Sequence, residues 1–299
     1  MNRVAKFLAH EGRVSLVVAH TTEMVEEIRK IHDLTPTTTA AMGRFATITG
    51  MMGFTEIKDS EDYFTAQING QGPMGTMISV VRREEYTSLV KVCVDNPHVE
   101  VPLKENGKLD VSAAVGNNGF LNIINKSEAT DTNYNGLVPL VTGEIAEDFT
   151  DYFAKSQQKP TVIALGVLVD KDGVRASGGY MIQLMPDATE EDIVKIENAL
   201  AKAPSISQMI DEGKSLETIA RTVVGDEDIM ILAQELDMKY ECDCNREKFE
   251  AGLISIGKEE LEKIIEEDEK ANIVCNFCKE EYDFNKQDLE ELMNRLENN

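Results

Sequence analysis

Hydrophobic and polar positions alternate with two different periods over the first 184 residues of the chain. A period of two is typical of strands, and a recurrence at every third or fourth position is typical of helices. The shorter period predicts strands over 3–9, 13–20, 63–69, 74–82, 86–94, 120–125, 161–169 and 174–184. The longer period predicts helices that begin near Thr21, at Pro36 and at Gly143.

Small residues form one face of the helix that is expected to begin at Pro36, so we expect this helix to pack closely against its neighbours. The small residues on this face are Ala40, Ala41, Gly43, Ala46 and Gly50. Asp172-Gly173 is a strong turn signal and predicts a hairpin between the last two strands. Strands and helices are mixed without regular alternation, which predicts an α+β domain over 1–184, with a mixed or antiparallel sheet and packed helices.

The pattern changes after Leu184 to three short helical stretches over 185–234. Thr189 and Asp192 are spaced as a capping box at the start of the first stretch, and Gly225 ends the third. Their apolar faces are moderate, so the segment is expected to depend on its neighbours for order. We interpret it as a helical linker.

The last 65 residues, 235–299, form a third region with four of the five cysteines. Cys242 and Cys244 form a C-x-C pair, and Cys275 and Cys278 form a C-x-x-C pair after an intervening charged stretch. Two such pairs can meet at one tetrahedron, and zinc is the usual metal of an all-sulfur site. A disulfide pair, an iron–sulfur cluster and the absence of any metal are the alternatives.

The composition of this region indicates that it needs a metal ion or a disulfide to stay folded. The chain has a net charge of −24, of which residues 185–299 carry −18 and residues 235–299 carry −11. A small and strongly acidic module rarely folds without a metal or a disulfide, so zinc removal is expected to unfold it. The same charge repels phosphate backbones, which argues against nucleic-acid binding.

The spacing of the first pair leaves two roles open for the site. Cys242 and Cys244 could form a disulfide only as a small, strained ring, and strained disulfides are often regulatory. One interpretation is therefore a redox switch that binds metal when reduced and releases it when oxidised. The other is a permanent structural zinc site.

Other sequence features give no second site. Cys93 lies in an apolar strand and is expected to be a buried residue, and the four histidines are dispersed. No secretory signal and no run of about 20 apolar residues is present, so we expect a soluble, cytoplasmic protein without membrane contact.

With these residues in place, the chain resembles a known family, the redox-regulated heat-shock chaperones (holdases) of about 33 kDa found in bacteria. The resemblance covers essentially the whole chain. It is carried by the cysteine quartet with Tyr282 and Phe284 behind it, and by the stretches 36–44, 67–73, 143–148 and 165–168.

The resemblance implies an ATP-independent holdase and not an enzyme. It implies that the reduced form is inactive and holds one Zn²⁺ per chain through Cys242, Cys244, Cys275 and Cys278. It implies that oxidation forms the disulfides Cys242–Cys244 and Cys275–Cys278, expels zinc, unfolds the module and loosens the linker. The implied partners are unfolding client proteins and, in the active form, a second copy of the chain.

Two other classes of function remain open from the residues alone. A thiol-disulfide oxidoreductase would use the same cysteines, although the chain lacks a thioredoxin-like C-x-x-C at the start of a helix. A constitutive interaction protein would hold a purely structural zinc.

Overall fold

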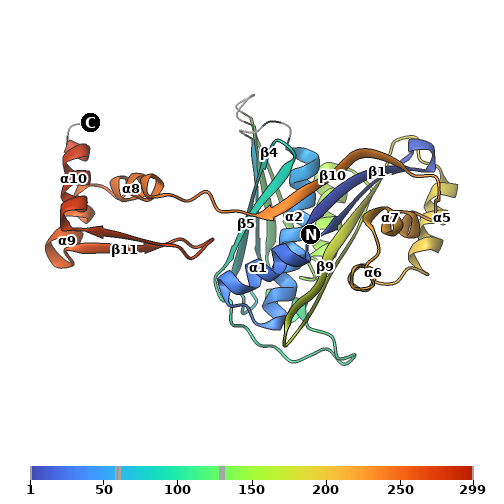
Figure 1. The fold of residues 1–299 in the computed structure, drawn as a ribbon, viewed down its shortest axis with the longest axis horizontal. Coiled ribbons are helices and arrows are strands. Elements are labelled where there is room, and N and C mark those ends of the chain that lie inside the picture. Colours follow the sequence, from blue (N-terminus) through green and yellow to red (C-terminus); the bar gives the residue numbers. More distant parts are fainter. Residues whose placement is uncertain (1, 58, 60–61, 128–131, 298–299) are drawn as a thin grey trace. The chain divides into compact units, whose positions relative to one another are not determined.

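The computed structural model describes residues 2–57, 59, 62–127 and 132–297 of the chain (Figure 1). It divides into two compact units, Met1–Glu241 and Cys242–Asn299. This division follows contacts within the chain, so a linker that packs on a domain is counted as part of that domain. The expected division into regions 1–184, 185–234 and 235–299 therefore stays a prediction.

One ten-stranded sheet forms the centre of the N-terminal unit, in the order β7-β6-β3-β4-β5-β10-β1-β2-β9-β8. Neighbouring strands are antiparallel except for β5 and β10, which run parallel. The strands are β1 (Arg3–Ala9), β2 (Val14–His20), β3 (Tyr63–Asn69), β4 (Thr76–Glu84), β5 (Thr87–Val94), β6 (Phe120–Ser127), β7 (Thr132–Pro139), β8 (Thr161–Asp170), β9 (Gly173–Leu184) and β10 (Met230–Tyr240). This large sheet with its helices confirms the predicted α+β class.

Helices cover the sheet, and the longest of them is almost entirely buried. They are η1 (His10–Gly12), α1 (Thr22–His32), α2 (Pro36–Glu56), α3 (Val111–Val115), α4 (Ala146–Tyr152), the π-helical turn η2 (Phe153–Gln157), α5 (Glu190–Leu200), α6 (Ile206–Asp211) and α7 (Leu216–Val224). A Cβ on Gly43 of α2 would lie 2.6 Å from a Val25 methyl group, and one on Gly50 would lie 2.5 Å from the Met238 sulfur. The small residues therefore allow the predicted close packing.

Strands β1 and β2 are buried on both faces by different sets of helices. On β1, Val4 belongs to the main core that includes α1 and α2, whereas Ala5 and Phe7 belong to a second core. The second core is closed by apolar residues of α5–α7, among them Ile196, Met209, Ile219 and Val223. The segment predicted as a linker therefore covers an apolar face of the sheet.

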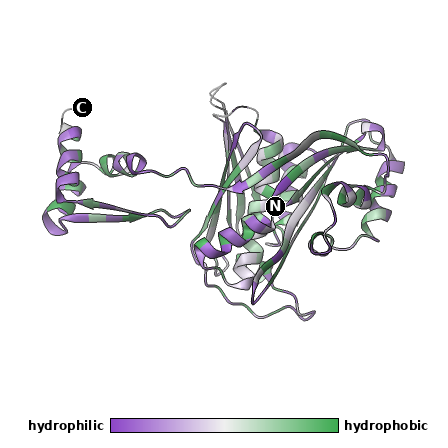
Figure 2. Ribbon diagram, in the orientation of Figure 1, coloured by the Kyte–Doolittle hydropathy of each residue, from purple (hydrophilic) through white to green (hydrophobic). Residues whose placement is uncertain are grey.

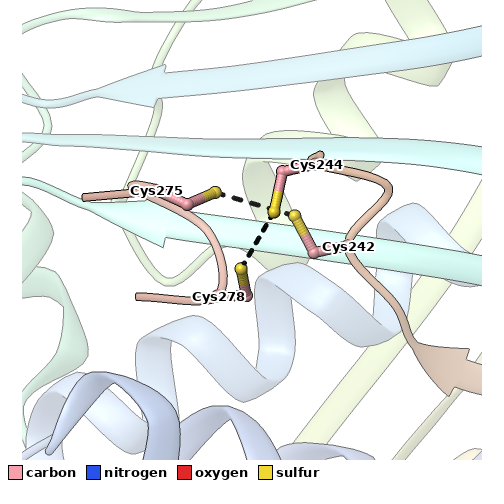
Figure 3. A group of neighbouring side chains, drawn as sticks. All are labelled: Cys242, Cys244, Cys275 and Cys278. Atoms are coloured by element: carbon pink, nitrogen blue, oxygen red, sulfur yellow. Dashed lines mark hydrogen bonds between the residues drawn. The ribbon is translucent and has the colours of Figure 1, made fainter. Parts of the chain in front are cut away.

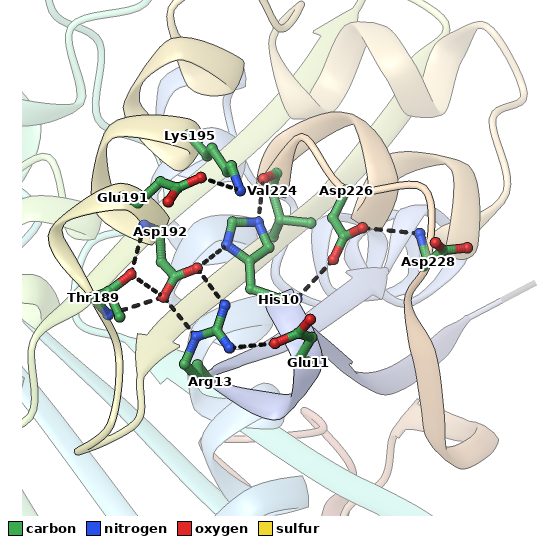
Figure 4. Close-up of polar contacts among 10 residues, drawn as sticks. All are labelled: His10, Glu11, Arg13, Thr189, Glu191, Asp192, Lys195, Val224, Asp226 and Asp228. Carbon is green, nitrogen blue, oxygen red and sulfur yellow. Dashed lines mark hydrogen bonds and ion pairs between the residues drawn. The ribbon is translucent and has the colours of Figure 1, made fainter.

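A buried polar network also ties α5 and α7 to the turn between β1 and β2 (Figure 4). Asp192, 1% exposed, accepts hydrogen bonds from Arg13 Nε at 2.8 Å and Nη2 at 3.1 Å, and its Oδ1 lies 3.0 Å from His10 Nδ1. His10 Nε2 lies 2.9 Å from the Val224 carbonyl oxygen, and Asp226 accepts the His10 backbone N–H at 2.7 Å. The Arg13 hydrogen bonds hold the pKa of Asp192 well below its usual range.

The structure corrects one predicted boundary and adds elements that the sequence pattern did not indicate. The helix expected from Gly143 begins at Ala146, because Gly143 and Ile145 have positive φ values of 74° and 75°. Asp148 stabilises this turn by accepting backbone N–H groups, including that of Ile145 at 2.9 Å. Strands β7 and β10 and helix α3 were not predicted.

Candidate metal centre

The C-terminal unit places its four cysteines on two loops. Cys242 and Cys244 lie in the extended stretch before α8 (Arg246–Ser255), which α9 (Lys258–Glu267) follows. Strands β11 (Lys270–Val274) and β12 (Glu281–Asn285) pair as a hairpin, and α10 (Lys286–Glu297) follows. Cys275 and Cys278 lie in the turn of this hairpin.

The four sulfur atoms converge to within 4.8 Å of one another (Figure 3). Sγ of Cys242 lies 3.7 Å from Sγ of Cys275, and Sγ of Cys244 lies 3.3 Å from Sγ of Cys278. Zinc–sulfur bonds of about 2.3 Å give a tetrahedron whose edges are about 3.8 Å. The donor set and its spacing therefore fit one metal ion of the kind that all-thiolate sites bind.

Backbone N–H groups point at three of these sulfurs and favour their charged form. Burial works against ionisation of Cys275, but N–H groups of Cys278 and Phe277 donate to it and lower its pKa. Burial raises the pKa of Cys278 to about 11 and that of Cys242 above its usual range. Because metal ligation needs thiolates, metal binding at this site has to displace protons.

A small apolar core holds the two loops in place. It consists of Leu253, Leu261, Phe284, Leu289 and Leu292. The Arg246 guanidinium lies 4.2 Å from the centroid of the Phe284 ring, a cation–π contact. The helices of this unit are largely hydrophilic (Figure 2), and residues 242–299 contain 17 acidic and 8 basic residues. Such a core is small for a unit with this much self-repulsion.

Tyr282 of β12 also contacts the site, which sequence spacing did not reveal. Its hydroxyl oxygen lies 3.3 Å from Sγ of Cys244, and this hydrogen bond raises the pKa of Tyr282 above its usual range. Its ring packs on that of Phe249 of α8 with a centroid distance of 4.6 Å. The only sequence signal was the position of Tyr282 shortly after Cys278.

The remaining candidates lie outside this cluster. Cys93 was expected to be buried, but it is a half-buried residue of β5 in the N-terminal unit. His10 and His32 are buried, the first in the network around Asp192 and the second beside Tyr240. Over the residues that the structure describes, Cys242, Cys244, Cys275 and Cys278 are the one group of three or more side chains that could hold a metal ion.

Comparison with known proteins identifies the family. Residues 2–285 match the family described as Hsp33 protein. The 33 kDa chaperonin of Clostridioides difficile is 44% identical over 98% of this chain and 99% of its own, and that of Caldanaerobacter subterraneus subsp. tengcongensis is 39% identical over 99% of each. The crystal structure of the 33 kDa chaperonin (heat shock protein 33 homolog) from Thermotoga maritima shares 32% identity and a TM-score of 0.88, covering 100% of this chain and 99% of that one.

A chain with this sheet, these covering helices and a terminal unit whose four cysteines could hold a metal ion has the architecture of a chaperone. It belongs to the Hsp33 family. The family predicted from the sequence is thus confirmed. Within the described ranges, no helix has both the length and the apolar composition needed to cross a membrane.

Proposed function

We propose that this protein is a redox-regulated, ATP-independent holdase that binds unfolding proteins and prevents their aggregation under oxidative stress. The observation that carries the proposal is the convergence of four cysteine sulfurs within a unit whose own apolar core is small. The chaperonin names of the relatives support a chaperone function. They give no sign of enzymatic activity, and we propose none.

In the reduced state the proposed ligands of one Zn²⁺ per chain are Cys242, Cys244, Cys275 and Cys278. Zinc supplies the Lewis acidity and charge that stabilise four neighbouring thiolates. The chain's own residues do the rest. The two loops set the spacing of the sulfurs, and backbone N–H groups donate to Cys242, Cys275 and Cys278.

Oxidation by hydrogen peroxide would proceed in two steps within each pair. A thiolate sulfur attacks one peroxide oxygen, the O–O bond breaks, and a sulfenic acid and hydroxide form. The second thiolate of the pair attacks the sulfenic sulfur, the S–O bond breaks, and a disulfide and a second hydroxide form. The two sulfurs lose two electrons in total, the peroxide gains them, and both hydroxides take up protons to become water.

The proposed disulfides are Cys242–Cys244 and Cys275–Cys278. A disulfide across the two loops would close a long chain segment and keep the unit compact, since cross-links over long loops restrict the unfolded chain most. Disulfides within each pair leave the loops free to separate. Only the second outcome unfolds a unit of 17 acidic and 8 basic residues when zinc leaves.

The client-binding surface is proposed to arise when α5–α7 lose their packing. These helices cover Ala5, Phe7, Leu16 and Val18 on one face of β1 and β2. Uncovering this face would offer an apolar surface to unfolded segments of a client. We further propose that the active form is a homodimer and that the protein acts in the cytoplasm.

Light scattering of a heat-unfolded client protein tests the proposal. The protein is added either reduced and zinc-loaded or after peroxide treatment at elevated temperature, and a chelating dye reports zinc release. We expect suppression of scattering only by the oxidised form, as zinc appears. Equal suppression by both forms would favour a structural zinc in a constitutive binder. No suppression, with turnover of a small disulfide substrate, would favour a thiol-disulfide oxidoreductase.

A further inference from the structure

The phenol of Tyr282 is fixed so that its hydroxyl group points at one sulfur of the cluster. Tyr282 is held in β12, opposite Ile273 of β11, and its ring is tilted by 37° against the ring of Phe249. Phe249 belongs to α8, the helix that follows Cys244 directly. Sheet pairing and ring packing therefore place the hydroxyl oxygen 3.3 Å from Sγ of Cys244.

This contact differs in kind from those of the other three sulfurs. Cys242 accepts a backbone N–H from Cys244, Cys275 accepts from Phe277 and Cys278, and Cys278 accepts from Glu280. Backbone donors are present whatever the side chain. When Cys244 is a thiolate, its donor is the hydroxyl group of Tyr282, which one substitution removes without loss of the ring.

We infer that Tyr282 is a positioning residue of the metal centre, whose hydroxyl hydrogen bond to the Cys244 sulfur sets how readily that sulfur is oxidised and how tightly zinc is retained. The inference rests on the proposed function, because it concerns the regulation of the same site.

The physical reason is the charge of an all-thiolate site. Four thiolates around one Zn²⁺ leave a net charge of −2, and a hydrogen bond from the Tyr282 hydroxyl group draws electron density from Cys244. A thiolate with less electron density is a weaker nucleophile toward the peroxide oxygen. Without the phenol, the Cys244 sulfur is more nucleophilic and is attacked faster. The four negative sulfurs then also lose a donor that offsets their mutual repulsion, and this repulsion outweighs the stronger donation from Cys244, so zinc is lost more easily.

The test compares the full-length protein with Tyr282→Phe. Outer-shell partners of metal ligands typically change metal affinity 10- to 100-fold, so we expect zinc affinity to fall by about 10-fold. We expect zinc release in hydrogen peroxide, followed with a chelating dye, to be several-fold faster. In the Co²⁺-substituted protein, the thiolate-to-cobalt charge-transfer band should move to longer wavelength, because the Cys244 sulfur donates more strongly.

Two control variants separate the hydrogen bond from other effects. Tyr86→Phe makes the same chemical change at an exposed position of the N-terminal unit and should alter none of the three measurements. Leu292→Ala truncates the small apolar core of the unit and changes neither Tyr282 nor Phe249, so it should lower stability with little shift of the charge-transfer band.

The outcomes distinguish this inference from the proposed function. If the unsubstituted protein binds no zinc, or keeps it in peroxide, the proposed function fails. If that protein binds and releases zinc as proposed, but Tyr282→Phe leaves the release rate and the cobalt band unchanged, the role of Tyr282 is wrong. A Tyr282→Phe variant with the same band shift as Leu292→Ala would show that loss of packing, and not loss of the hydrogen bond, is responsible.

Discussion

The two units of the chain are ordered by different means. In the N-terminal unit, a sheet buried by helices on two faces supplies an extended apolar core, which includes Phe45, Phe64 and Phe149. In the C-terminal unit, five buried apolar residues and four cysteines perform the same task for a chain segment with a high density of negative charge. The extended core of the N-terminal unit can lose one contact and remain folded. The small core of the C-terminal unit depends on the interaction that keeps its four sulfurs together.

Removal of the proposed zinc ion is expected to affect the two units most differently. Structural zinc contributes about 10–16 kcal/mol of apparent binding free energy in small peptides, and the C-terminal unit has only a small apolar core of its own. We expect a chelator, or Cys275→Ser, to abolish amide protection over 242–299 while β1–β9 stay protected in hydrogen exchange. Protection of 242–299 that persisted without zinc would show that the apolar core is sufficient.

The same Phe→Ala change in the core of each unit should show how differently the two units depend on their cores. Phe64→Ala in the N-terminal unit and Phe284→Ala in the C-terminal unit each remove a ring that is 1% exposed, at a cost of about 3–5 kcal/mol. We expect the first variant to remain folded with a lower midpoint in urea. The second should lose both order and zinc affinity. Equal loss of zinc in the two variants would contradict the independence of the units.

Asp192→Asn perturbs the N-terminal unit alone. It removes the charge that Arg13 and His10 contact, and a buried polar group that loses its partner costs about 1–3 kcal/mol. We expect faster hydrogen exchange in α5–α7 and more apolar-dye binding by the reduced protein, with unchanged zinc content. Glu191→Gln, an exposed change on the same helix, is the control. If both variants behave alike, the network does not hold the helices.

A change of pH should affect the two units differently. Because the raised pKa values of Cys242 and Cys278 keep these thiols protonated near neutrality, zinc must displace their protons. Each displaced proton weakens binding by about 1.4 kcal/mol for every unit by which the pH falls. Asp192 has a lowered pKa, so its contribution to the stability of the N-terminal unit is fully present at pH values above the ordinary carboxyl pKa. This contribution is lost only in acid. Zinc titrations and urea unfolding at two near-neutral pH values would check this, and a pH-independent zinc affinity would contradict it.

Local patterns predicted much of the fold and all four clustered cysteines, but not the contacts between distant segments. The capping box at Thr189 and Asp192 was visible in the sequence, whereas His10, which lies 182 residues from Asp192, was not a visible partner. Tyr282 stood out only as a neighbour of the cysteines, because hairpin pairing and the Phe249 ring decide where its hydroxyl group points. Strand β10 was missed because its partners, β1 and β5, lie far away in the sequence.

The position of β10 has a consequence for the newly made chain. This strand lies between β5 and β1, yet it is made after both of them and after α5–α7. During synthesis, β1 and β5 therefore keep open edges until residue 240 has left the ribosome, and open strand edges are where chains aggregate. A protein that is proposed to protect others from aggregation is therefore itself exposed to aggregation while it is being synthesised.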